Sequence, residues 1–129
     1  MTQQLMEDLL ALLAAMIFAD KHTYGEEIEA FLKESAKLQT TLNIEPRWSD
    51  AKILMWYELN KAAVKTNALG TDLEKWLYER VNGLSQIEDK AAILEAMRKI
   101  AISDGEIHVS ECALIVLTAR QWVLHPQGC

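Results

Sequence analysis

The sequence predicts an all-α protein: a compact single-domain bundle of about six helices, built around two α-turn-α hairpins. Apolar residues recur at helical spacing through most of the 129 residues, and no segment shows the two-residue alternation of a half-buried strand. Only two prolines and five glycines interrupt the chain. A chain of this length can bury a core without disulfide bonds, so we expect one domain over residues 1–129.

The charge balance argues against a nucleic-acid-binding protein. Thirteen basic residues face nineteen acidic ones, giving a net charge of −6, and the basic residues form no stripe that could follow a phosphate backbone. The longest apolar run, residues 9–19, is about half as long as a membrane span. Residues 1–10 also lack the basic start of a signal peptide. We therefore expect a cytoplasmic protein without membrane insertion.

The first hairpin is expected over residues 2–40. Residues 2–19 are apolar on most sides, which predicts a central helix covered by its neighbours. After a bend at residues 20–25, a second helix is expected over residues 26–40, with a narrower apolar stripe. That stripe comprises Ile28, Phe31, Leu32 and Leu38. Its charged residues are expected to face water: Glu26, Glu27, Glu29, Lys33, Glu34 and Lys37.

Pro46 marks a break at residues 41–49, because proline disfavours helix at the residue before it. Trp48 lies in this break, and two interpretations stay open: it fills the core, or it belongs to a binding surface. A third helix is expected over residues 49–67, with Gly70 after its end. Its apolar residues are Leu54, Met55, Trp56, Leu59, Ala62 and Ala63.

Two capping-box patterns predict where the next helices begin. Residues 71–74, Thr-Asp-Leu-Glu, have the spacing that lets two side chains bond the backbone at a helix start. They predict a helix over residues 71–84. Residues 85–88 repeat the pattern and open the second hairpin, residues 85–125, with helices to about Ser103 and from about Val109 to before Pro126. Trp76 and Trp122 are expected in the core.

Acidic residues gather at both bends. Asp104, Gly105 and Glu106 lie between the fifth and sixth helices, and Glu111 follows in the first turn of the sixth. The earlier bend has the same spacing of seven residues, from Asp20 to Glu27. We expect Asp104 to close its turn and Gly105 to supply a positive φ.

The segment Ile102-Ser103-Asp104-Gly105-Glu106-Ile107, with Glu111 in the next helix, resembles the signature of the TerB-like family. These are helical domains associated with tellurite resistance and also found in a DnaJ-like membrane chaperone. In that family a helix ends in a small residue, followed by Asp-Gly-x-Ile/Val and a helix with Glu in its first turn. The resemblance implies an all-α fold that carries this hairpin twice and spans nearly the whole chain.

The first hairpin departs from the family pattern. Asp20 and Glu27 match, but Lys21 stands at the Gly position and His22 at the next acidic one. Lys21 therefore places a positive charge beside the first corner, and the second hairpin fits the family pattern better.

One interpretation of the acidic corners is a divalent cation site. Carboxylates are the hard ligands that Ca²⁺, Mg²⁺ or Mn²⁺ prefers, and histidines would shift the preference toward Mn²⁺ or Zn²⁺. Clustered carboxylates also need a cation or protons to neutralise them. The candidate ligands are Asp20, Glu27, Asp104, Glu106 and Glu111, with His22 and His108 as further ligands.

The alternative interpretation is helix capping alone. A glutamate at the third position of a helix can accept hydrogen bonds from the backbone at the helix start. His108 and Glu111 would then be the cap and third residue of the sixth helix, and Tyr24 and Glu27 those of the second.

No enzyme motif accompanies these residues, so an acid/base role for Asp104 and Glu111 lacks a nucleophile and a substrate site. Cys112 shares its helix face with apolar residues and is expected to be a small buried hydrophobe. Two cysteines make no disulfide framework. We expect a non-enzymatic TerB-like domain with a protein partner or a cation in a stress response, or alternatively a structural adaptor or homodimer without ligand.

Overall fold

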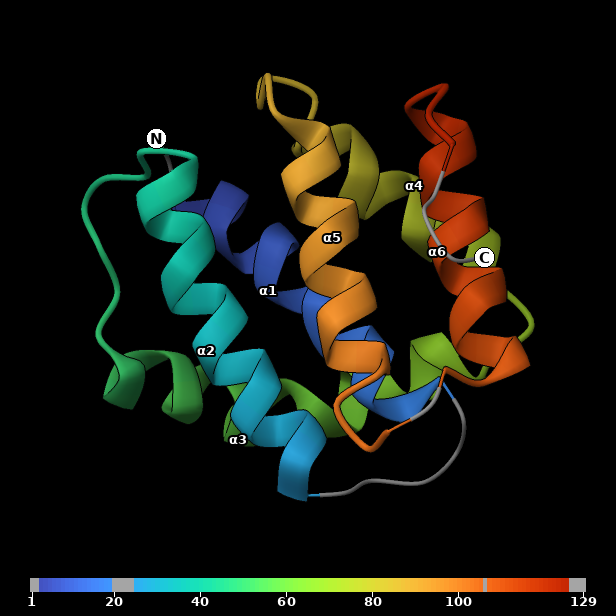
Figure 1. Cartoon of the computed structure of the whole chain (residues 1–129), viewed down its shortest axis with the longest axis horizontal. Helices are drawn as coiled ribbons and strands as arrows, with labels where there is room; N and C mark the ends of the chain where they lie inside the picture. The colour runs from blue at the N-terminus through green and yellow to red at the C-terminus, as the bar shows by residue number, and fades with distance from the viewer. Residues whose placement is uncertain (1–2, 20–24, 106, 126–129) are drawn as a thin grey trace.

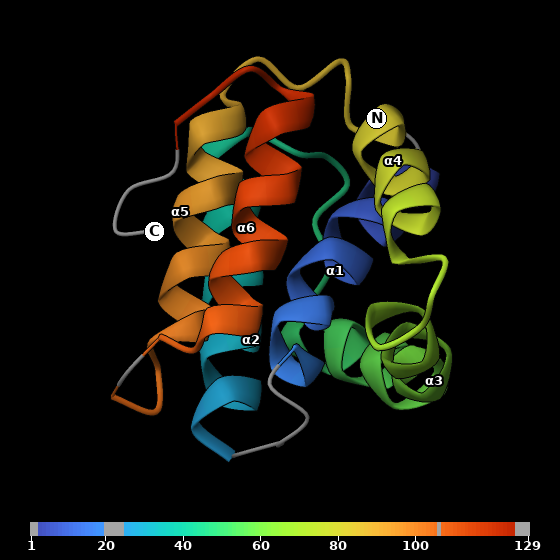
Figure 2. The same ribbon diagram turned by 90° about the vertical axis from the view of Figure 1, so that its right-hand side faces the viewer.

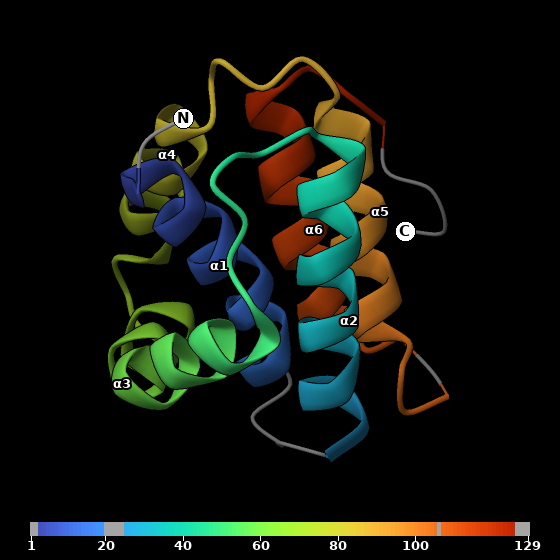
Figure 3. The same ribbon diagram turned by 90° about the vertical axis from the view of Figure 1, so that its left-hand side faces the viewer.

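The computed structural model describes residues 3–19, 25–105 and 107–125, and these residues form six helices and no strand, as the sequence predicts. The helices are α1 (Gln3–Phe18), α2 (Gly25–Thr41), α3 (Asp50–Ala68), α4 (Leu73–Gly83), α5 (Lys90–Ala101) and α6 (Val109–Gln121). They form two layers (Figure 1, Figure 2). α2, α5 and α6 lie along one another in one layer, and α1, α3 and α4 form the other (Figure 3). No helix among the described residues has the length and apolar character to cross a membrane.

α1 is the central helix of the fold. Thirteen of its sixteen residues are buried, and it packs against α2, α3, α4 and α5. Because neighbours cover it on most sides, an apolar band wider than one stripe is needed, and the sequence has that band. The prediction of a central first helix is confirmed.

α2 has a wider buried surface than the predicted stripe. Phe31 and Leu38 are buried as expected, but Glu27 and Glu34, which we expected to face water, are 0% and 6% exposed. The expectation was wrong because α2 packs against α5 on one side and against α1 and α3 on the other. A helix held between several neighbours buries polar positions beside its apolar stripe.

The break between α2 and α3 is held to the core by one glutamine. The Gln39 side chain, itself buried, accepts a hydrogen bond from the Trp48 backbone N–H at 2.6 Å and donates one to the Trp48 carbonyl at 3.0 Å. Trp48 is 7% exposed, so of the two interpretations the structure supports the one in which it fills the core. The Lys52 ammonium lies 4.2 Å from the centre of its ring.

α3 begins as predicted, with the Ser49 hydroxyl accepting a hydrogen bond from the Lys52 N–H, but its expected apolar face was wrong. Of the six apolar residues expected together, only Trp56 is buried, and Leu54, Met55 and Leu59 are 40%, 65% and 79% exposed. α3 packs on α1 through a narrower stripe. That stripe comprises Ile53, Trp56, Tyr57, Val64 and Ala68.

Neither predicted capping box opens a helix. α4 begins after Asp72 and α5 after Asp89, whose carboxylate accepts a hydrogen bond from the Ala92 N–H at 3.2 Å. Residues 85–88 instead form a turn in which Ile87 is buried. Before α5, this buried residue fixes the path of the chain before the helix can begin. Before α4, the start moves by one residue, to the cap residue Asp72.

Three further residues differ from expectation. Trp76 and Trp122 are half-buried at the edge of the core, packed against it without being enclosed. Cys112 is also half-buried, and it is not a free cysteine. The apolar residues on the same face of α6 predicted complete burial, but Cys112 stands in the first turn of the helix, where less of the core covers it.

Candidate functional site

The second corner, between α5 and α6, has the turn that the sequence predicts. Gly105 has a φ of 104°, a backbone conformation that favours glycine over residues with a Cβ atom. Its N–H donates to the Ile102 carbonyl at 2.9 Å, and the Ser103 hydroxyl donates to the Ile100 carbonyl at 2.7 Å. These bonds satisfy carbonyls at the end of α5 that have no partner within the helix.

Glu111 caps the start of α6. The His108 backbone N–H donates to the Glu111 Oε1 at 2.9 Å, with His108 as the N-cap residue. The Glu111 side chain is fully buried. The structure therefore shows at this corner the Glu111 cap that the capping interpretation predicts.

Asp104 joins this corner through the same histidine. The His108 Nε2 lies 3.2 Å from the Asp104 Oδ2, and the two side chains are 32% and 14% exposed. His108 thus links the corner in two ways: its backbone contacts Glu111, and its ring contacts Asp104. The arrangement holds two carboxylates next to one imidazole at the end of the helix pair.

At the first corner, Glu27 occupies the third position of α2 and is fully buried. α2 packs on α3, where burial raises the pKa of Tyr57 and the charges of Glu58 and Glu27 add to that effect. The Tyr57 ring stacks on Phe18 at 6.3 Å between centroids and meets Phe31 at 5.5 Å. The charge of Glu27 therefore acts on a tyrosine that belongs to an aromatic cluster.

The remaining expected residues of the corners, Asp20, His22, Tyr24 and Glu106, lie outside the described residues. Within the ranges that the structure describes, no three His, Cys, Asp or Glu side chains are arranged to hold a metal ion. The carboxylates of Asp104 and Glu111 and the imidazole of His108 have the chemistry of a cation site. By themselves they do not form a complete one.

Both corners lie at the same end of the bundle. The last turns of α1 and α5 and the first turns of α2 and α6 are all at the lower end in Figure 1. The fold thus brings the two hairpin bends to the same end of the bundle.

The capping role of Glu111 leads to a prediction. Replacement by Gln should leave the free energy of unfolding nearly unchanged, because the Gln side-chain oxygen can accept the same hydrogen bond from the His108 N–H. Replacement by Ala should lower it by about 0.5–1 kcal/mol, because the cap is lost. Urea unfolding of both variants measures this, and equal losses in the two would contradict the role.

Sequence reasoning missed a second polar site, centred on Asp8. This carboxylate is 3% exposed within the apolar helix α1. Its Oδ1 lies 3.2 Å from the Arg80 Nε and accepts a hydrogen bond from the Gln4 Nε2 at 3.2 Å. The sequence did contain a signal, since Asp8 stands one helical turn from the apolar residues Leu5 and Leu12, in a segment expected to be covered on most sides.

Asp8 should make stability fall as the pH rises. Burial raises the pKa of its carboxyl above 3.8, against the opposing effects of Arg80 and Gln4. The folded protein therefore binds this proton more tightly than the unfolded chain does, and the free energy of unfolding decreases with pH between the two pKa values.

We expect the stability of the natural protein, relative to Asp8→Asn, to decline as the pH rises from 3.8, the usual pKa of an aspartic acid, through the raised pKa. Urea unfolding of both proteins from about pH 3 to about pH 8 measures the difference. A difference that is constant with pH, or that grows as the pH rises, would contradict the raised pKa.

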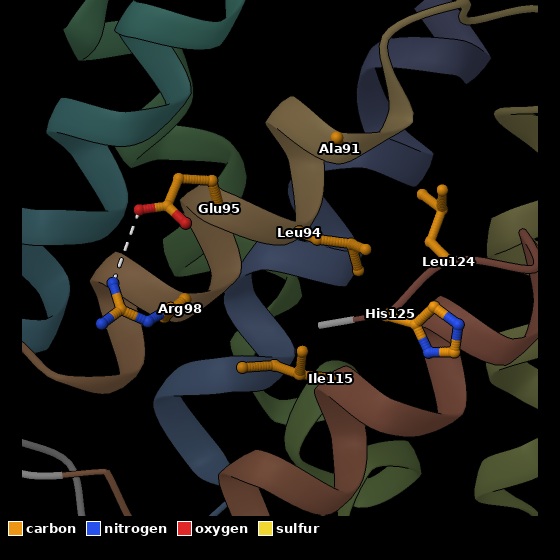
Figure 4. Close-up of a pocket in the computed structure, with 7 residues that line it drawn as sticks. All are labelled: Ala91, Leu94, Glu95, Arg98, Ile115, Leu124 and His125. Atoms are coloured by element: carbon orange, nitrogen blue, oxygen red, sulfur yellow. Dashed lines mark hydrogen bonds and ion pairs between the residues drawn. The ribbon is translucent and has the colours of Figure 1, made fainter. Parts of the chain in front are cut away.

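A small pocket of about 140 Å³ lies between α5, α6 and the chain that follows α6 (Figure 4). Leu94, Ile115 and Leu124 line its apolar part, and His125 stands at its edge (Figure 4). On the other side Arg98 pairs with Glu95 at 3.5 Å. Because Arg98 is already paired with a carboxylate of its own helix, the described lining residues offer little polar chemistry for a ligand.

Comparisons with known proteins identify the family. No curated protein and no solved structure matches the chain. One family model does match, described as tellurite resistance protein TerB, and it covers residues 6–128. The match includes all of α2 to α6 and most of α1, and so both hairpins. The chain therefore belongs to the TerB family.

Proposed function

We propose that this chain is a non-enzymatic TerB domain that acts in the cytoplasm, in tellurite resistance or a related stress response, by binding a protein partner. The observation that carries the proposal is the outer face of α3, where Leu54, Met55 and Leu59 are exposed. Single exposed apolar residues are ordinary, but neighbouring ones on one helix mark an interaction site. Residues 54, 55 and 59 stand on adjacent turns of α3.

The charges around this face suit a partner with charges of both signs. Lys61 and Glu58 pair at 2.8 Å on the same helix, and both are about half exposed. Mixed charges around an apolar centre are the usual anatomy of a protein interface. We call Leu54, Met55 and Leu59 the α3 face.

The test replaces the α3 face without touching the core. Met55→Glu with Leu59→Glu should leave urea unfolding nearly unchanged, because both side chains are mostly exposed. In the native host, deletion of the gene should lower growth in tellurite, and the double variant should fail to restore it. Val109→Glu, at a residue 88% exposed on α6, is the matched control and should restore growth.

Full restoration of growth by the folded double variant would overturn the α3 face as the binding site. Sedimentation separates the alternative function, an adaptor that pairs with itself. A natural protein that dimerises with rising concentration, and a double variant that stays monomeric, would assign the α3 face to a second copy of this chain.

A second candidate function is cation binding at the corner formed by Asp104, His108 and Glu111. What favours it is the burial of Glu27 and Glu111 at the same end of the bundle, since buried carboxylates are stabilised by neutralising charge. A cation there would be held by Asp104, Glu111 and His108, with Asp20, Glu27, His22 and Glu106 as further ligands. Ca²⁺, Mg²⁺, Mn²⁺ and Zn²⁺ are the ions to try.

Thermal unfolding of metal-stripped protein tests this candidate. An ion bound by the native state at about a hundred times its dissociation constant should add about 2.7 kcal/mol. Asp104→Asn with Glu111→Gln should remove the gain while keeping the cap. A gain that survives in this variant would exclude the corner, and no gain with any of the four ions would leave these carboxylates as helix caps.

A further inference from the structure

A pocket of about 310 Å³ lies between α1, α3 and α4, the three helices of the second layer (Figure 3). Neither of the proposed sites uses it, since the α3 face lies elsewhere on α3 and the acidic corners belong to the hairpins. Its lining is polar and aromatic: two carboxylates, three amides, one guanidinium and two indoles.

The carboxylates are Glu7 and Asp8. Asp8 is buried, and its polar contacts with Arg80 and Gln4 both use Oδ1. Oδ2 lies against Gly83, so closely that no Cβ atom would fit there. Glu7 also lines the pocket and is half-buried. Arg80 is the one cation among the described residues that line the pocket, against the two carboxyl groups of Glu7 and Asp8.

The amides add hydrogen-bond acceptors. The Asn60 side-chain nitrogen donates to the Trp56 carbonyl at 2.7 Å, and the Asn67 nitrogen donates to the Ala63 carbonyl at 2.9 Å. The Gln4 nitrogen is likewise engaged with Asp8. Because a carbonyl can only accept, these bonds fix which end of each asparagine is the nitrogen, and the side-chain oxygens are left as acceptors.

Trp56 and Trp76 supply the aromatic part of the lining. The Arg80 guanidinium already lies 5.8 Å from the centre of the Trp76 ring, which is within the range of cation–π attraction. Aromatic faces together with carboxylates and carbonyl oxygens attract a cation that carries N–H donors. The same lining disfavours an anion, which would face two carboxylates and the negative faces of the rings.

We propose that this pocket binds an organic cation, an alkylammonium or guanidinium group, through Trp56, Trp76 and Glu7. The asparagine oxygens accept its N–H donors, and the indoles contact its alkyl part. Two sources supply this chemistry: a free amine, or a lysine or arginine side chain of another protein. The proposal does not depend on the α3 face or on a metal at the corners.

The four tryptophans provide the measurement. In a titration of the full chain with n-butylammonium, followed by ¹H–¹⁵N correlation spectra, the indole N–H signals of Trp56 and Trp76 should shift and saturate. Those of Trp48 and Trp122, which do not line the pocket, should stay in place. A ligand this small should bind in the millimolar range. n-Butanol and butyrate, of similar size but neutral and anionic, should not produce the shifts.

Substitutions test whether Trp76 and Glu7 contact the bound cation. Trp76→Leu should weaken binding about tenfold through the lost cation–π contact, and Glu7→Gln about threefold through the lost charge. Both side chains are at most half-buried, so the variants should fold. Glu29→Gln, on the exposed side of α2, removes the same charge away from the pocket and should bind as the natural protein does.

Absence of saturable shifts, equal shifts with butanol, or equal weakening by Glu29→Gln and Glu7→Gln would each overturn the proposal. Two further ligands distinguish the source of the cation. Tighter binding of putrescine than of a lysine blocked at both ends assigns the pocket to free amines. The reverse order assigns it to a side chain of a partner protein.

Discussion

Leu12→Ala should lower the free energy of unfolding by about 2–5 kcal/mol, because it removes a large side chain from the middle of α1 and leaves a cavity. Leu12 is fully buried, and α1 is the helix against which α2, α3, α4 and α5 all pack. The surrounding helices are held by one another, so they can collapse only partly into the space. Urea unfolding followed by tryptophan fluorescence measures the loss.

The matched control is the same substitution on the surface. Leu59→Ala, at a residue that is 79% exposed, should change the free energy of unfolding by less than about 0.5 kcal/mol. Similar losses in the two variants would mean that α1 is not the centre of the core or that α3 is covered on its outer side. The pair therefore tests the layered arrangement of the helices as well as the burial of Leu12.

Gln39→Ala should also be strongly destabilising, by about 2 kcal/mol or more. The variant removes both side-chain hydrogen bonds to the Trp48 backbone and leaves a buried N–H and a buried carbonyl without partners. Each buried polar group left without a partner lowers the free energy of unfolding by about 1–3 kcal/mol. The segment that connects α2 to α3 would also lose its link to α2, so amide hydrogen exchange at Trp48 should accelerate.

Gln86→Ala provides the control for Gln39. Gln86 is exposed in the turn between α4 and α5, and its loss should leave unfolding nearly unchanged. A Gln39→Ala variant as stable as Gln86→Ala would show that the paired hydrogen bonds to Trp48 contribute nothing net.

The number, order and approximate bounds of the helices were predictable from the sequence. Periodic apolar residues give helices, and the few glycines and prolines give their limits. The second corner was predictable in detail, because a Gly at positive φ and a capping Glu three residues after its N-cap are local features. Both depend on residues close together in the chain, and the family signature rests on the same segment.

The starts of α4 and α5 were not predictable in this way. The same capping pattern that holds at Glu111 fails at Thr71 and Ser85, since α4 begins after Asp72 and α5 after Asp89. The turn before α5 must first place a buried residue. Ile87 occupies that position before α5.

By itself, the sequence determined an all-α protein, its central first helix and a capped acidic corner, because each follows from local spacing. Only the tertiary structure decided which side of a helix is covered. It left Leu59 exposed, buried Glu27 and Glu34, and enclosed Asp8 beside Arg80, Trp56 and Trp76. These outcomes depend on the neighbours that helices meet across the bundle, and a periodic pattern shows that a face is apolar without showing what will pack against it.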